Sequence, residues 1–212
     1  MPNEAIKPAL RAALRAHEIG DRTPYEISFA GKAKSGGSFG FMQGDLAADQ
    51  PIVHTTFRRC MAAAGMSDAK INDLDRRLST KGADPTVIFT AEKAAIDAAL
   101  QASSKLVDAM DEAILGTVYR QLDACIGAAA DANRTIAPIA QIYIALWANM
   151  SGPSTKILDW LRNTDEDQDL GDTVTEPDMY LYLSVTKYFE EHPENFMHFT
   201  ESAGVGAMLL PH

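Results

Sequence analysis

The sequence predicts a mostly α protein, and three observations indicate this class. Alanine, leucine and isoleucine are common, runs of β-branched residues are scarce, and apolar residues recur at helical spacing along most of the chain. With 212 residues, the chain is long enough to bury a sizeable core. We therefore expect a single helical domain over residues 1–212.

Residues 4–19 predict the first helix. Ile6, Leu10 and Leu14 recur every fourth residue, so they form one apolar stripe along it. Gly20 follows directly and is a typical helix stop.

The rest of the chain divides into one loop region and a series of helices. Residues 20–50 predict a long loop region with short strands around 25–30 and 38–43, and loops of this length are usually functional when they are ordered. Ser67 and Thr90 are suitable N-caps, and 203–212 is expected to be a loosely held tail. Further helices are predicted at 51–65, 68–78, 90–102, 104–131, 136–150, 154–162, 177–191 and 194–202.

Charge and composition exclude several classes of function. The formal net charge of −10 disfavours binding to duplex nucleic acid or to an anionic membrane surface. The sequence has no apolar run of 18 residues, so we expect no stable membrane insertion, and the first residues lack the apolar segment of a signal peptide. Cys60 and Cys125 do not make a disulfide framework, and we expect both to be buried thiols.

Glu18 is the least ordinary residue of the first helix. It continues the stripe one turn beyond Leu14, so it should point toward the edge of the core. Burial and the helix C-terminus both disfavour its negative charge, and such a carboxyl is suited to be a general acid. The alternative is an ordinary helix-end residue that reaches water or pairs with Arg15 or Arg22.

The loop that follows contains "SGGSFGFMQGD", residues 35–45. Its small residues would let the backbone approach a ligand closely, and Gln43 adds an amide side chain. The loop is neither a dinucleotide fingerprint nor a Walker loop.

A helix that ends in Glu, followed by this loop, resembles the goose-type lysozymes and lytic transglycosylases. The loop is similar to their "GLMQ" motif, with Phe41 in place of Leu, and Asp45 matches a "MQxD" variant. A second stretch, "IALWANMSGPSTKILDWL" at 144–161, is similar to their "LAAYNAGPGAVRRWL" at Asn149, Gly152 and Pro153.

The chain departs from the family pattern at several points. The family's Ser after Glu is Ile19 here, and its Tyr before Asn is Ala148. The span between the two motifs is also longer than usual, which predicts an inserted helical segment at about 66–131. The residues after the second motif, about 163–212, are expected to form a helical extension.

The resemblance implies cleavage of the β-1,4 bond between N-acetylmuramic acid and N-acetylglucosamine in peptidoglycan, with no required cofactor. Glu18 would be the general acid, although the spacing of Glu26 to Gln43 also fits the family. Asp45, Asp21 or Glu26 could activate water, or the muramyl 6-hydroxyl could attack internally and give an anhydro product. The residues proposed to contact the glycan strand are Ser28, Ser38, Phe39, Gln43, Trp147 and Asn149.

Two other classes of function remain open from the sequence. One is a non-catalytic helical adaptor or glycan-binding protein with a degenerate groove, and the other is a helical regulator unrelated to sugars. For the enzyme, we expect synthesis in the cytoplasm and action in the periplasm or at the cell wall after release or export, as for a phage endolysin or a secreted toxin.

An acidic loop near residue 170 has the spacing of a cation site. Asp165, Asp167, Asp169 and Glu176 occupy positions 1, 3, 5 and 12 of a twelve-residue loop, as in a calcium-binding EF-hand. Leu170 stands where that motif has glycine. The alternative is a solvated loop in which Thr175 and Asp178 cap the next helix.

Overall fold

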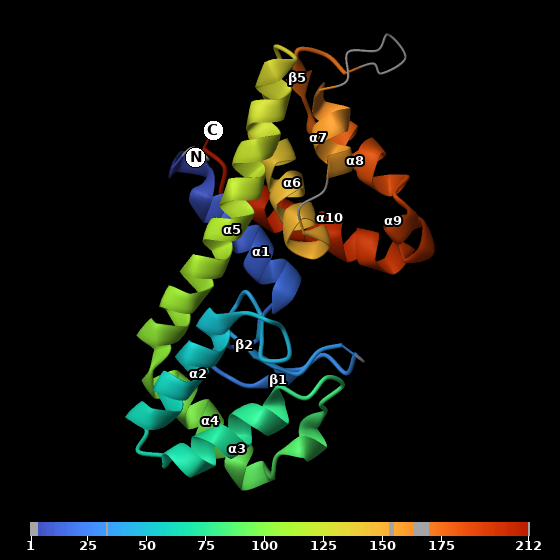
Figure 1. Cartoon of the computed structure of the whole chain (residues 1–212). Coiled ribbons are helices and arrows are strands. Elements are labelled where there is room, and N and C mark those ends of the chain that lie inside the picture. The colour runs from blue at the N-terminus through green and yellow to red at the C-terminus, as the bar shows by residue number, and fades with distance from the viewer. Residues whose placement is uncertain (1–3, 33, 153–154, 163–169, 212) are drawn as a thin grey trace. The chain divides into compact units, whose positions relative to one another are not determined.

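The computed structural model describes residues 4–32, 34–152, 155–162 and 170–211 (Figure 1). The prediction of a mostly α protein is confirmed, because helices dominate and the strands are only two or three residues long. None of the helices within these ranges combines the length and the apolar character needed to cross a bilayer.

The chain divides into two compact units. Met1–Gly20 and Gly116–His212 form one, here called the discontinuous unit, and Asp21–Leu115 form the other, the inserted unit. The sequence predicts one domain with an inserted segment at about 66–131, and in this division the loop region and its strands also belong to the inserted unit. The long helix α5, Ser104–Asp131, contributes to both units.

The inserted unit begins with a small antiparallel sheet where short strands were predicted. β1 (Ser28–Phe29) pairs with β2 (Gly37–Phe39), and β2 pairs with β3 (Gly44–Asp45). Three helices and a 3-10 turn follow: α2 (Pro51–Ala63), α3 (Asp68–Leu78), η2 (Pro85–Val87) and α4 (Thr90–Ala102).

The start of α3 matches its predicted cap, and that of α4 does not. Ser67 Oγ accepts a hydrogen bond from the Lys70 amide, as expected of an N-cap. Thr90 is instead the first helical residue of α4. The amide of Phe89 donates to the Glu92 carboxylate at 2.9 Å, so Glu92 satisfies the backbone at this helix end.

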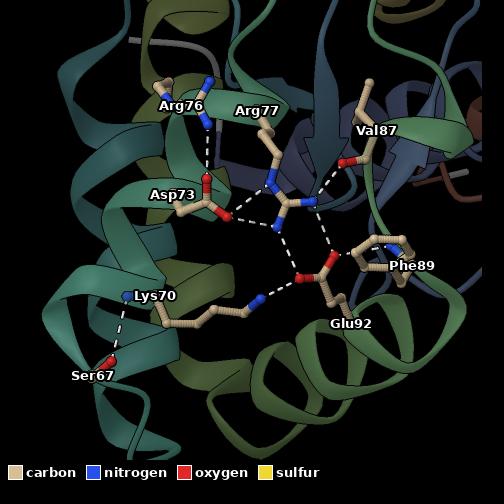
Figure 2. Close-up of polar contacts among 8 residues, drawn as sticks. All are labelled: Ser67, Lys70, Asp73, Arg76, Arg77, Val87, Phe89 and Glu92. Atoms are coloured by element: carbon tan, nitrogen blue, oxygen red, sulfur yellow. Dashed lines mark hydrogen bonds and ion pairs between the residues drawn. The ribbon is translucent and has the colours of Figure 1, made fainter.

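Helices α3 and α4 are joined by an ion-pair network around Glu92 (Figure 2). The Arg77 guanidinium donates to both Glu92 oxygens, at 3.0 and 2.9 Å, and to the Val87 carbonyl at 2.6 Å. The Lys70 ammonium also contacts Glu92. The hydrogen bond from Arg77, together with those from Lys70 and the Phe89 amide, lowers the pKa of Glu92 to about 2.

The discontinuous unit is built around α1 (Lys7–Glu18), which follows the short 3-10 turn η1 (Glu4–Ile6). α1 packs against α6 (Pro138–Ser151) and α10 (Pro193–Ala207) (Figure 1). The remaining elements are β4 (Thr135–Ile136), α7 (Thr155–Arg162), β5 (Thr173–Val174), α8 (Glu176–Ser184) and α9 (Lys187–Glu191), with β4 and β5 paired in parallel.

The C-terminal region differs from its prediction in two ways. The helix expected at 177–191 is interrupted after Ser184, where the Thr186 hydroxyl donates to the Leu183 carbonyl at 2.7 Å. The predicted tail is helical as far as Ala207, because Gly206 packs against the α1 backbone at Ala9. A side chain at residue 206 would collide with that carbonyl.

Candidate functional site

Glu18 is the last residue of α1 and lies where the apolar stripe predicted it. Ile6, Leu10 and Leu14 are at most 3% exposed, and Glu18 is half-buried. The amide of Gly20, at φ +55°, donates to the Arg15 carbonyl, so the helix stops as predicted. The carboxyl group is therefore held at the edge of the core.

Asn149 donates a hydrogen bond from its amide nitrogen to Glu18 Oε1 at 2.6 Å. The two residues are 131 positions apart, and both belong to the discontinuous unit. They are the residues that the sequence analysis took from the two separate motifs as general acid and as glycan contact. The fold thus brings two of the sequence-predicted site residues into direct contact.

Two histidines lie next to this pair and were missed by the sequence analysis. The His17 ring stacks on the His198 ring at 4.9 Å between centroids, and a His198 ring nitrogen lies 3.0 Å from the His17 carbonyl. Burial and, second, the neighbouring His198 lower the pKa of His17 to about 4. The two positions are 181 residues apart, so no local pattern could have linked them.

Gln43 is held within the loop of the inserted unit. Its amide nitrogen donates to the Gly40 carbonyl at 2.9 Å, and the Ser28 hydroxyl donates to its Oε1 at 2.9 Å. Its φ is +49°, a left-handed conformation that is uncommon for a residue with a side chain. The structure therefore brings Ser28 and Gln43 together, as two of the predicted glycan contacts. Glu18 lies in the other unit.

Asp111 is a buried carboxylate that the sequence analysis did not select. It is 0% exposed, and its oxygens accept hydrogen bonds from the amides of Phe41 and Met42 at 2.9 and 3.1 Å. It lies on α5, seventy residues from Phe41. Its sequence signal would have been one acidic residue on the apolar face of a helix, close to Met110 and Leu115.

Two glycines of the loop are required by close packing within the inserted unit. A Cβ on Gly36 would overlap the Leu78 carbonyl, and a Cβ on Gly40 would overlap the Asp111 carboxylate. These glycines let the loop approach its own helices, α3 and α5. The expectation that they serve a ligand has no support in these contacts.

The side chain of Asp45 holds the loop together by accepting hydrogen bonds from backbone amides. Its Oδ1 accepts from the amides of Gly36 and Ala47 at 2.9 and 2.7 Å. Glu26, the alternative acid, is exposed, and the amide of the next residue, Ile27, donates to Asp97 at 2.8 Å.

Two predicted glycan contacts of the inserted unit are buried. Phe39 is 0% exposed and packs in the core against Phe57, with 6.2 Å between ring centroids. Its ring is therefore not available to a sugar, and its assignment as a groove residue is corrected. Ser38 is 6% exposed, and its carbonyl accepts from the Ser28 hydroxyl.

Trp147 lies on α6 of the discontinuous unit, two residues before Asn149. It is half-buried, and its ring contacts those of Tyr188 and Phe189. Two residues correspond to about 200° around a helix, so Trp147 and Asn149 lie on opposite sides of α6. The structure does not place them on one binding face.

The proposed calcium ligands Asp165, Asp167 and Asp169 lie outside the described residues. Glu176, the fourth, accepts a hydrogen bond from the Tyr143 hydroxyl at 3.0 Å. Elsewhere in the described ranges, no three His, Cys, Asp or Glu side chains are grouped as metal ligands would be.

The cap expected at the start of α8 is present. The amide and the hydroxyl of Thr175 donate to Asp178 at 2.7 and 2.6 Å.

No family model, no curated protein and no solved structure matches this chain.

Proposed function

We propose that this protein cleaves the β-1,4 glycosidic bond of peptidoglycan, with Glu18 as the general acid. The observation that carries the proposal is the contact between Glu18 and Asn149. These two residues, 131 positions apart and taken from two separate stretches of the sequence, meet within one unit of the fold. The half-buried position of Glu18 at the end of α1 also supports the proposal, because it holds the carboxyl group at the edge of the core.

Asn149 would orient the acid. A protonated carboxyl group has one oxygen that accepts hydrogen bonds and one that carries the proton. Because Asn149 donates to Oε1, it favours the proton on Oε2 when the carboxyl group is protonated. Asn149 is in this sense a positioning residue for proton transfer.

The broken glycosidic bond can be completed by either of two nucleophiles. Glu18 gives its proton to the leaving sugar oxygen as the glycosidic bond breaks. Water then adds to the anomeric carbon and gives a reducing end, or the muramyl 6-hydroxyl adds and gives a 1,6-anhydro end. A proton returns to Glu18 or to a second base in either case.

The test is digestion of purified peptidoglycan by the wild type and by Glu18→Gln, with mass spectrometry of the released fragments. We expect Glu18→Gln to lose about 10²- to 10⁴-fold in rate, since general acid catalysis is typically of this size. The comparison variant is Glu26→Gln, which changes the rival glutamate, exposed in the structure, to the same amide. Loss in Glu26→Gln without loss in Glu18→Gln contradicts the assignment of Glu18, whereas loss in both variants is the result expected if Glu26 activates the water.

A non-catalytic glycan-binding protein is the second candidate. It is favoured by the hydrogen bonds that occupy Gln43 and Asp45 within their own loop. Sedimentation with insoluble peptidoglycan, without release of any fragment by the wild type, would support binding over cleavage.

A further inference from the structure

A small pocket lies between α5, α6 and α7 of the discontinuous unit. Its volume is about 100 Å³, somewhat smaller than the roughly 150 Å³ of an engineered apolar cavity that accepts benzene. Its described lining side chains are uncharged, and most of them are apolar. The lining residues used below are Gln121, Cys125, Ile144, Trp147 and Ala148.

Two residues of this lining carry polar atoms for which the described part of the chain offers no partner. Trp147 Nε1 and Gln121 Oε1 are buried, and neither has a hydrogen-bond partner among the described residues. One is a donor and the other is an acceptor. A buried polar group without a hydrogen bond is costly, so two such groups around one cavity call for an explanation.

The pocket is separate from the proposed catalytic pair. Ile144, Trp147 and Ala148 line it from one side of α6, whereas Asn149 contacts Glu18 from the other side. A ligand here would therefore be a second ligand, and the inference does not depend on glycosidase activity.

We infer that this pocket binds a small neutral ligand, apolar except for one group that both accepts and donates a hydrogen bond, as a secondary amide does. The ligand's acceptor would receive the Trp147 indole N–H, and its donor would reach Gln121 Oε1. The uncharged lining disfavours an ionic ligand, because a buried unpaired charge is costly. Burial also raises the pKa of the Cys125 thiol to about 11, so this residue adds no charge at neutral pH.

The experiment uses the indole N–H signals in the ¹⁵N–¹H NMR spectrum of the full chain. The protein has two tryptophans, so Trp147→Phe assigns both signals. On titration with N-methylacetamide, we expect a saturable shift of the Trp147 signal alone. Trp160, whose ring lies 4.4 Å from that of Tyr182, is the internal control.

Matched variants distinguish a ligand that forms a hydrogen bond with Gln121 from one that only occupies the apolar cavity. Gln121→Met removes the acceptor with little change of length and should weaken N-methylacetamide binding about fivefold, the value of one ordinary hydrogen bond. Gln101→Met, at an exposed glutamine of the inserted unit, should change nothing. The amide spectrum of each variant checks that it is folded.

Two further probes can overturn the inference. N,N-dimethylacetamide lacks the donor and should bind to wild type about as weakly as N-methylacetamide binds to Gln121→Met. If benzene binds as tightly as N-methylacetamide, and Gln121→Met has no effect, the pocket is only an apolar cavity. A Trp147 signal that does not move during the titration also contradicts the inference.

Discussion

Gly40 and Asp111 are in contact so close that residue 40 can carry no side chain. A Cβ at this position would overlap the Asp111 carboxylate, and the φ of Gly40 is +82°. The same carboxylate accepts hydrogen bonds from the backbone amides of the next two residues, Phe41 and Met42. The loop that suggested a glycan site is thus fixed in place by a carboxylate of α5 that stands seventy positions after Phe41.

Asp111→Ala should destabilise the inserted unit by about 2–4 kcal/mol, because two buried amides lose their acceptors. The control is Asp108→Ala, on the same helix, which removes only the partner of the Tyr25 hydroxyl and should cost about 1 kcal/mol. Hydrogen exchange is the suitable measurement, because two units need not unfold together. Equal effects of both variants would contradict the anchoring role of Asp111.

Gly206→Ala should destabilise the discontinuous unit by about 1–3 kcal/mol, because the new methyl group would collide with the Ala9 carbonyl and the Ala13 side chain. Gly204, on the same helix, provides the control, because a methyl group there would meet no atom of another described element within 4 Å. Gly204→Ala should stabilise the helix by up to about 1 kcal/mol. Thermal unfolding of the two variants should therefore shift in opposite directions.

The discontinuous unit should lose stability as the pH falls from about 6.5 to 4. Burial and His198 lower the pKa of His17 to about 4, so in this range the unfolded chain binds a proton that the folded chain does not. The contribution of His17 to the slope of the unfolding free energy against pH is at most about 1.4 kcal/mol per pH unit. His17→Phe should reduce this slope, because it removes the group that protonates only in the unfolded chain.

Glu92→Gln should destabilise the α3–α4 pair by about 1–3 kcal/mol at pH 7, since Arg77 and Lys70 would lose a charged acceptor. The contribution is complete above the ordinary carboxyl pKa near 4.5 and is lost as the pH falls toward 2. Asp73→Asn, at a 42% exposed carboxylate of the same network, should cost less than Glu92→Gln, because solvent screens an exposed ion pair. A wild-type and a Glu92→Gln protein with the same acid sensitivity would contradict this assignment.

The helices could be predicted from the sequence because their signals are local. Periodicity placed 68–78, 90–102 and 104–131 at the residues where the structure has α3, α4 and α5. The stripe of α1 likewise placed Glu18 at the edge of the core, since its direction follows from helical spacing alone.

The contacts of the candidate site were harder to predict because most are long-range. Asp111 and His198 meet their partners across 70 and 181 positions, and neither stands in a recognisable motif. Phe39 was misassigned because an aromatic residue beside glycines is typical of a binding loop, while its actual partner, Phe57, lies in a later helix. Asn149 was found only because a second motif pointed to it.

The packing of α1 sets the order in which this chain can fold during synthesis. The buried stripe of α1 has its packing partners in α6 and α10, and α10 begins only at Pro193. α1 therefore leaves the ribosome before the helices that cover it. All the residues of the inserted unit are made before either partner exists. A nascent chain stalled before Pro138, where α6 begins, would therefore expose Leu10 and Leu14 and recruit chaperones, whereas its inserted unit could already be protected from protease.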